Sequence, residues 1–219
     1  MEYALNIDHI SYSYHTLNGE TPAVTDVSIT IEKGEFIAIV GPSGCGKSTL
    51  LNIIAGYDTF TSGDIKVTED VMTIFQNYEL IDELTIYDNI FLGRKPSKEN
   101  KLLLKRMGLS KLLKQYPTEL SGGQKKRVGI TRALISNPSI ICCDEPTESL
   151  DVENKAIVLD ILKKYANDHI VIMATHQKDT VLDYADYVIQ FKDTHVSMFT
   201  RTGFEGHDPV PPQTNPVPE

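Results

Sequence analysis

The sequence predicts the α/β fold class, with a mainly parallel sheet between helices. Continuous apolar runs of strand length, at 36–40, 140–143 and 170–174, alternate with stretches whose apolar residues recur at helical spacing. Strands buried on both faces produce such runs, and helices between them give parallel connections. Two segments with period-two alternation, 3–10 and 24–31, come before the first run. We therefore also expect an N-terminal antiparallel β subdomain.

Glycine and proline divide the rest of the chain into elements. Residues 18–22 predict a turn or loop between the first two strands. Apolar spacing is helical from residue 77 to about 120, including 109–113, which predicts a helical insert. We expect residues 1–200 to form one domain and the Gly- and Pro-rich residues 201–219 to be a disordered tail. The other expected elements are helices at 48–55, 122–135, 152–165 and 180–184, and strands at 64–67, 71–75, 188–191 and 196–199.

Composition excludes several classes of protein. The 219 residues can bury a core without disulfide bonds, and the net charge of −9 argues against nucleic-acid binding, which needs clustered Lys and Arg. Cys45, Cys142 and Cys143 lack the spacing of a metal site or a disulfide framework, although a redox role for Cys45 stays open. The sequence has no export signal and no apolar run of about 18 residues, so we expect a cytoplasmic protein.

A glycine-rich loop follows the run at 36–40 and precedes a helix. Glycines let successive backbone N–H groups turn towards phosphate oxygens, and the helix N-terminus adds positive potential. Lys47 supplies a mobile charge for the outer phosphates, and the Ser48 hydroxyl is a ligand for Mg²⁺. The sequence therefore predicts a nucleotide site in a P-loop NTPase core. The loop fits G-x-x-x-x-G-K-[ST] with Gly41, Pro42, Ser43, Gly44, Cys45, Gly46, Lys47, Ser48 and Thr49.

The apolar run at 140–143 ends in two carboxylates, Asp144 and Glu145. Open parallel sheets bind ligands at the carboxyl ends of their strands. Asp144 is therefore predicted to hold Mg²⁺, and Glu145 to polarise the water that attacks the γ-phosphate. Alone, the pair could equally be an acidic helix cap before a turn at Pro146. Because the chain also contains the glycine-rich loop, we favour the roles of metal ligand for Asp144 and of general base for Glu145.

A second anion site is predicted at Ser121, Gly122, Gly123 and Gln124, which follow Leu120 and begin a helix. Two glycines there leave bare N–H groups at a positive helix end. One chain has a use for only one γ-phosphate. The alternative is a serine N-cap with a glycine turn.

With these motifs in this order, the chain resembles the ATP-binding cassette family, the ATPase subunits of ABC transporters, from about residue 3 to 200. The resemblance implies ATP and Mg²⁺ as cofactors and Ser121–Gln124 as the family's signature, which contacts nucleotide. It also implies roles for residues that the chain's own pattern does not single out. These are Tyr14, which stacks on adenine, with Tyr12 as the competing candidate; Gln76, a metal ligand and hinge; Asp151, in the D-loop near nucleotide; and His176, which binds the γ-phosphate beside Glu145.

The resemblance further implies a head-to-tail dimer of two copies or closely related cassettes, in which each signature closes on the other subunit's ATP. It implies a transmembrane permease partner and a place at the inner face of the cell membrane, reached only through that partner, with no direct nucleic-acid contact. Import and export both stay open. So do two other functions: a cassette that signals to a membrane partner without moving a solute, and a soluble cassette outside transport.

Two features depart from the family's pattern. Residues 63–76 are fewer than expected, so the antiparallel subdomain should be trimmed. Glu148 stands where the family usually has a small residue, at the expected dimer interface, and either alters dimer affinity or is a tolerated exposed carboxylate. Lys125, Lys126 and Arg127 form a basic run that we interpret as a solvated helix face, with direct phosphate contact as the alternative.

Overall fold

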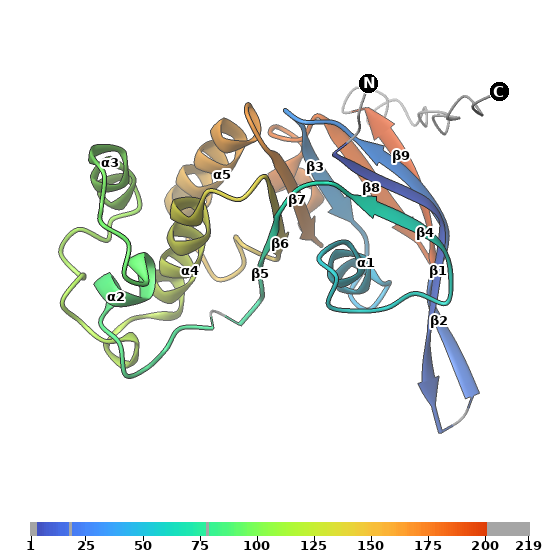
Figure 1. Ribbon diagram of the computed structural model, residues 1–219, viewed down its shortest axis with the longest axis horizontal. Coiled ribbons are helices and arrows are strands. Elements are labelled where there is room, and N and C mark those ends of the chain that lie inside the picture. The colour runs from blue at the N-terminus through green and yellow to red at the C-terminus, as the bar shows by residue number, and fades with distance from the viewer. Residues whose placement is uncertain (1–3, 18, 78, 201–219) are drawn as a thin grey trace.

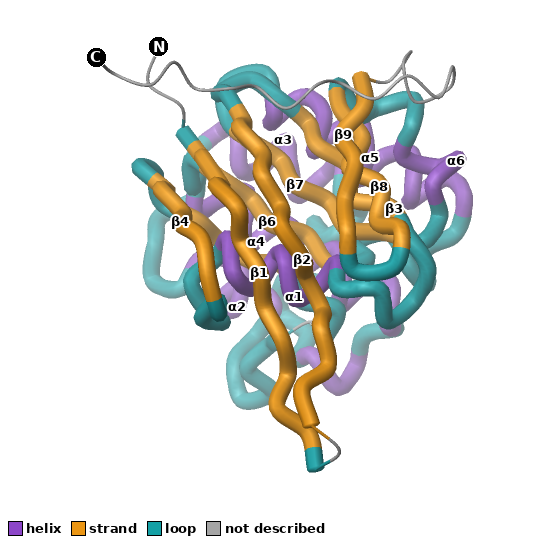
Figure 2. The backbone as a smooth tube through the Cα atoms, turned by 90° about the vertical axis from the view of Figure 1, so that its right-hand side faces the viewer, coloured by secondary structure: helices purple, strands orange, loops and turns teal. Residues whose placement is uncertain are grey.

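The computed structural model describes residues 4–17, 19–77 and 79–200 and contains two sheets. The larger has the strand order β5-β6-β7-β3-β8-β9, and the smaller has the order β2-β1-β4 (Figures 1 and 2). All pairings in the larger sheet are parallel except that of β8 with β9. The mainly parallel sheet and the antiparallel N-terminal sheet are therefore confirmed. The strands of the larger sheet are β3 (Phe36–Val40), β5 (Val71–Ile74), β6 (Ile140–Asp144), β7 (Ile170–Thr175), β8 (Tyr187–Lys192) and β9 (His195–Thr200).

Side chains of β3 alternate between two hydrophobic clusters, one on each face of the sheet. Phe36 and Ala38 join the cluster that contains helices α4 (Gly122–Ser136) and α5 (Val152–Ala166). Ile37 and Ile39 join the cluster that contains α1 (Lys47–Ile54) and the smaller sheet. Helices thus cover one face and α1 with the antiparallel strands covers the other (Figure 1). This burial on both faces explains why the central strands have continuous apolar sequences.

Cys142 and Cys143 point to opposite faces of β6, as neighbouring strand residues do. Both are fully buried, as the sequence predicts. Burial raises the pKa of the Cys142 thiol to about 12 and that of Cys143 well above its usual value. Both thiols therefore stay protonated and act as small apolar side chains.

The N-terminal hairpin is longer than predicted. Strands β1 (Leu5–Thr16) and β2 (Gly19–Ile31) pair up to Thr16 and Gly19, so residues 19–22, predicted as turn or loop, belong to a strand. Most of the additional strand residues are exposed, so they do not need to alternate apolar and polar side chains, and the sequence pattern does not reveal them. Strand β4 (Ser62–Val67) pairs with the other edge of β1 and completes a three-stranded sheet.

Residues 77–120 contain less helix than predicted. The structure has α2 (Ile86–Phe91), α3 (Lys98–Arg106) and a 3₁₀ turn at Pro117–Glu119. Residues 109–113, predicted as helical, form hydrogen-bonded turns. The buried amide of Asn89 organises the loop before α2, because its side chain bonds Ile81 and the carbonyls of Leu84 and Thr85. These bonds from one side chain hold the backbone before α2, which is not helical.

One short helix, α6 (Lys178–Val181), follows β7; it begins two residues before the helix predicted at 180–184, and residues 182–184 form a turn. The expected tail at 201–219 lies outside the described residues. Across the part of the chain that the structure describes, no helix combines the length and the apolar character needed to cross a bilayer.

Candidate nucleotide site

The glycine-rich loop joins β3, in the middle of the larger sheet, to α1. Gly46 is the N-cap of α1 and has φ +109°, a conformation open to glycine. A Cβ added there would lie 2.1 Å from the carbonyl oxygen of Ala23, so the backbone of β2 packs directly against the loop. No side chain caps α1. The first N–H groups of this helix are thus left for a ligand.

Lys47 is 7% exposed and curls back over the loop. Its Nζ donates hydrogen bonds of 2.9 Å to the carbonyl oxygens of both Gly41 and Pro42. These contacts hold the ammonium group against the curled backbone, among the N–H groups expected to bind phosphate. The Lys47 ammonium group is thus held by carbonyl oxygens of the loop itself.

Two oxygen ligands of the kind that Mg²⁺ prefers meet beside this loop. The Ser48 hydroxyl, at the start of α1, faces the Asp144 carboxylate at the end of β6 closely enough to lower its pKa. Burial raises the pKa of Asp144, while the Ser48 hydroxyl and the charge of Lys47 oppose the rise. A hydroxyl and a partly desolvated carboxylate fit a hard divalent cation. The two residues therefore fit the predicted metal site.

Glu145 is held in one orientation by the neighbouring strand. It is 9% exposed, and its carboxylate accepts hydrogen bonds from the Thr175 hydroxyl at 3.0 Å and the His176 backbone N–H at 2.9 Å. The His176 Nδ1 lies 2.7 Å from the same carboxylate. Because β6 and β7 pair in parallel, their carboxyl ends bring Glu145 and His176 together. A base fixed by its own neighbours is suited to orient a water molecule.

The segment Ser121–Gln124 begins α4, on the face of the sheet opposite α1. Ser121 is an N-cap: its hydroxyl accepts from the Gln124 N–H at 3.3 Å, and the Gln124 amide oxygen accepts from the Ser121 N–H at 2.8 Å. The serine-cap interpretation is thus correct for the free chain. Ser121 and Gly122 are exposed at this helix end. A ligand can still reach the N–H groups there.

Three further predicted residues surround these groups. Tyr14 is 43% exposed, and its hydroxyl lies 2.7 Å from the Thr49 hydroxyl; Tyr12 packs against it edge-on and is less exposed. Gln76, just after β5, donates from Nε2 to a Glu148 carboxylate oxygen at 3.0 Å. Asp151 is the N-cap of α5 and accepts from the Asn154 backbone at 2.8 Å. The structure thus brings Tyr14 to the glycine-rich loop and ties Gln76 to the loop after Glu145.

Sequence reasoning missed Thr175 and misplaced Lys126. Lys126 was assigned to a solvated helix face, but it is 3% exposed and its Nζ donates to the Glu145 carbonyl at 2.7 Å. The helical spacing contained the signal, because Lys126 is four residues before the buried Ile130 and eight before the buried Leu134. The position of Lys126 on the buried, apolar face of α4 therefore decides its burial, in spite of its charge.

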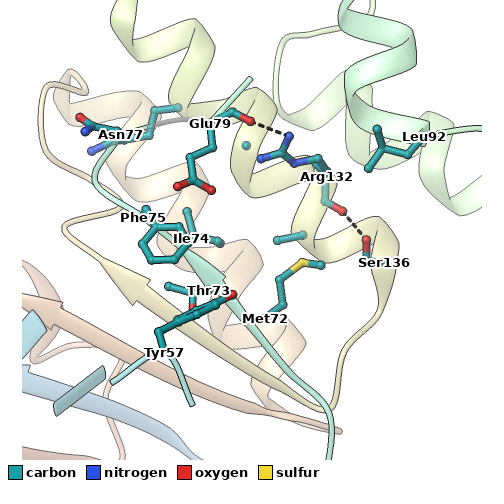
Figure 3. Close-up of a pocket in the computed structure, with 13 residues that line it drawn as sticks. Tyr57, Met72, Thr73, Ile74, Phe75, Asn77, Glu79, Leu92, Arg132 and Ser136 are labelled. Atoms are coloured by element: carbon teal, nitrogen blue, oxygen red, sulfur yellow. Dashed lines mark hydrogen bonds between the residues drawn. The ribbon is translucent and has the colours of Figure 1, made fainter. Parts of the chain in front are cut away.

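A cavity of about 220 Å³ lies beside Gln76, between β5 and α4 (Figure 3). Tyr57 and Phe75 pack together at its wall, with ring centroids 5.3 Å apart. Arg132 crosses it to donate to the Glu79 carbonyl at 2.9 Å. Tyr57 and Leu92, at its border, are 60% and 49% exposed. The cavity is therefore a partly apolar surface adjoining the site.

Comparison with known proteins agrees with this geometry. A sequence profile described as "ABC transporter" matches residues 24–148. The ABC transporter ATP-binding protein YtrE of Bacillus subtilis is 37% identical over 94% of this chain and 96% of its own length. The cell division ATP-binding protein FtsE of Mycobacterium tuberculosis is 30% identical over 93% and 99%. The dimeric, post-hydrolysis structure of the ATP-binding cassette MJ0796 bound to ADP and Pi has a TM-score of 0.81 at 29% identity, covering 90% of this chain and 98% of its own.

Proposed function

The chain belongs to the ABC transporter family as an ATP-binding subunit that hydrolyses ATP, and from this premise we propose that two copies close head to tail on two ATP and drive a transmembrane permease. The observation that carries the proposal is the separation of the two anion sites. The glycine-rich loop and α1 lie on one face of the sheet, and α4, which Ser121 caps, lies on the other. Each site then completes a nucleotide pocket only with its counterpart on a second subunit.

Within one pocket, the backbone of Gly41–Thr49 and Lys47 bind the phosphates, and Tyr14 stacks on adenine. Ser48, Asp144 and Gln76 are the oxygen-bearing residues that would hold Mg²⁺. Bound Mg²⁺ supplies charge neutralisation at the outer phosphates. Glu145 orients and deprotonates the attacking water, and His176, already beside Glu145, donates to the γ-phosphate. The partner's pocket is completed by Ser121, Gly122, Gly123, Gln124 and Asp151.

Cysteine crosslinking tests the head-to-tail arrangement. We expect a chain carrying Ser43→Cys, Ser121→Cys and Glu145→Gln to form a covalent dimer under mild oxidation when ATP is present. Both serines are exposed, whereas the native cysteines are buried and react slowly. The measurement is the doubled mass on a denaturing gel, with each single cysteine variant as control. An intrachain disulfide in a monomer-sized product, or no ATP-dependent product, would contradict the proposal.

The cavity beside Gln76 is the proposed contact with the permease. Its border carries an exposed aromatic and an exposed aliphatic side chain, Tyr57 and Leu92, and its lining includes Phe75 and Asn77, the two neighbours of Gln76. We expect Tyr57→Asp to lower recovery of the membrane partner at least about tenfold in affinity purification, because a charge would be buried without a counter-ion. Turnover of the purified subunit should change less than about twofold.

Leu17→Asp is the matched control for this test. Leu17 is fully exposed after the last paired residue of β1 in the β1–β2 hairpin, whose course Figure 2 shows, and it is not among the residues that line the cavity. Equal loss of the partner in both variants would sink the assignment of the cavity as the docking surface.

The proposed location is the cytoplasmic face of the cell membrane, with membrane contact only through the permease and no direct nucleic-acid contact. Signalling without solute transport is the second candidate, favoured by the likeness to a protein named for cell division. Reconstitution with the co-purified membrane partner separates the two. ATP-dependent solute flux supports transport, and partner activation without flux supports signalling.

A further inference from the structure

A buried lysine lies directly under the catalytic loop, and the mechanism above does not use it. Lys126 is on α4, 3% exposed, and its Nζ donates to the Glu145 carbonyl oxygen at 2.7 Å. The same carbonyl accepts from the Glu148 N–H at 3.2 Å. A carbonyl oxygen has two lone pairs, so these two contacts saturate it.

Burying an ammonium group is costly unless charges and hydrogen bonds compensate. Burial lowers the pKa of Lys126, and the negative charges of Glu148, Glu145 and Asp144 oppose the fall. The ammonium group of Lys126 is therefore within electrostatic range of Asp144, at the end of β6, and of Glu145 and Glu148 in the loop that follows. A buried ammonium group that keeps its hydrogen bond to the Glu145 carbonyl can therefore hold the backbone of this loop in place.

The conformation of Glu145 needs such support. Its φ is +49°, in the left-handed region that a residue with a side chain adopts only where its surroundings impose it. Thr175 and His176 fix the carboxylate from β7. Lys126 fixes the main chain from the other side. The base is thus clamped between β7 and α4.

We propose that Lys126 is a positioning residue that ties the start of α4 to the base. Ser121, the N-cap, and Lys126 are five residues apart at the start of α4, which is about 7.5 Å along the helix axis. This inference rests on the proposed function, in which Ser121 contacts the ATP of the second subunit. Closure at that ATP then sets the orientation of Glu145 at the chain's own ATP. The contact couples the two sites of the dimer.

Substituting the lysine tests this role. Lys126→Met keeps the apolar stem and removes the donor, so kcat should fall about 10- to 100-fold, as expected for a small displacement of a catalytic group. KM for ATP should stay within about twofold, and ATP-dependent dimerisation should persist, because neither anion site is altered. Lys126→Gln keeps an N–H donor and should recover at least about a third of the lost kcat on a logarithmic scale.

Lys125→Met is the matched control, because Lys125 precedes it on α4 and is only half-buried. It should leave kcat and KM within about twofold. Normal kcat in folded Lys126→Met overturns the proposal. So does a parallel loss of ATP binding and dimerisation, which would mean a purely structural role, or a Lys126→Gln variant no better than Lys126→Met. Failure of the proposed function itself is distinguishable, because the unsubstituted chain would then not dimerise with ATP.

Discussion

Glu145→Gln is expected to lower ATP turnover by about 10²- to 10⁴-fold, the usual worth of a general base. Glutamine has nearly the same shape, and its amide oxygen can still accept from the His176 N–H, so the loop should keep its fold. What it loses is the capacity to take a proton from water. ATP should then bind and close the dimer without being cleaved. We expect an ATP-bound dimer to accumulate, detectable by size-exclusion chromatography with bound nucleotide.

The control for this experiment is Glu69→Gln, which removes an exposed carboxylate between β4 and β5, remote in sequence from the loop. Both variants change the net charge by the same amount, so a general electrostatic effect would appear in both. Turnover of Glu145→Gln within about threefold of the unsubstituted chain would show that another group activates the water. The assignment of Glu145 as the base would then be wrong.

Local patterns in the sequence were enough to place the nucleotide loop and the ends of the parallel strands. An apolar run, a glycine-rich loop and a helix are adjacent in the chain, so β3 and α1 follow from short-range rules. The pairing of Glu145 with His176 also follows, because parallel strands end at one edge. The roles of these residues stay predictions.

Contacts between distant segments could not be predicted in the same way. The Gln76–Glu148 hydrogen bond joins residues 72 positions apart, and neither residue type suggests the other. The sequence indicates Glu148 as an interface residue or a tolerated surface charge and gives no sign of its contact with Gln76. The prediction for Lys126 is wrong for a different reason. Its charge predicts a solvated side chain, whereas its helical position predicts a buried one. Residues 109–113 were misread because apolar spacing alone does not exclude a series of turns.

Gly46→Ala is expected to abolish the nucleotide site and to destabilise the fold by at least about 3 kcal/mol. The backbone at +109° already costs an alanine about 1–3 kcal/mol. The added Cβ would lie 2.1 Å from the Ala23 carbonyl oxygen, well inside contact distance, so either β2 or the loop must move. Because β2 is paired with β1 over most of its length, we expect the loop to move and the N-terminus of α1 with it.

Gly44→Ala separates the clash from the backbone strain. Gly44 also has positive φ, +80°, but an added Cβ there meets nothing within 4 Å. It should cost about 1 kcal/mol and lower the melting temperature only a few degrees. Thermal melts and binding of a fluorescent ATP analogue, done on both variants, measure the difference. If the two variants melt together and bind the analogue equally, the packing of β2 against the loop does not shape the site. If only Gly46→Ala melts at a lower temperature and loses binding of the analogue, the conformation of the phosphate loop depends on its packing against β2 as well as on its own glycines.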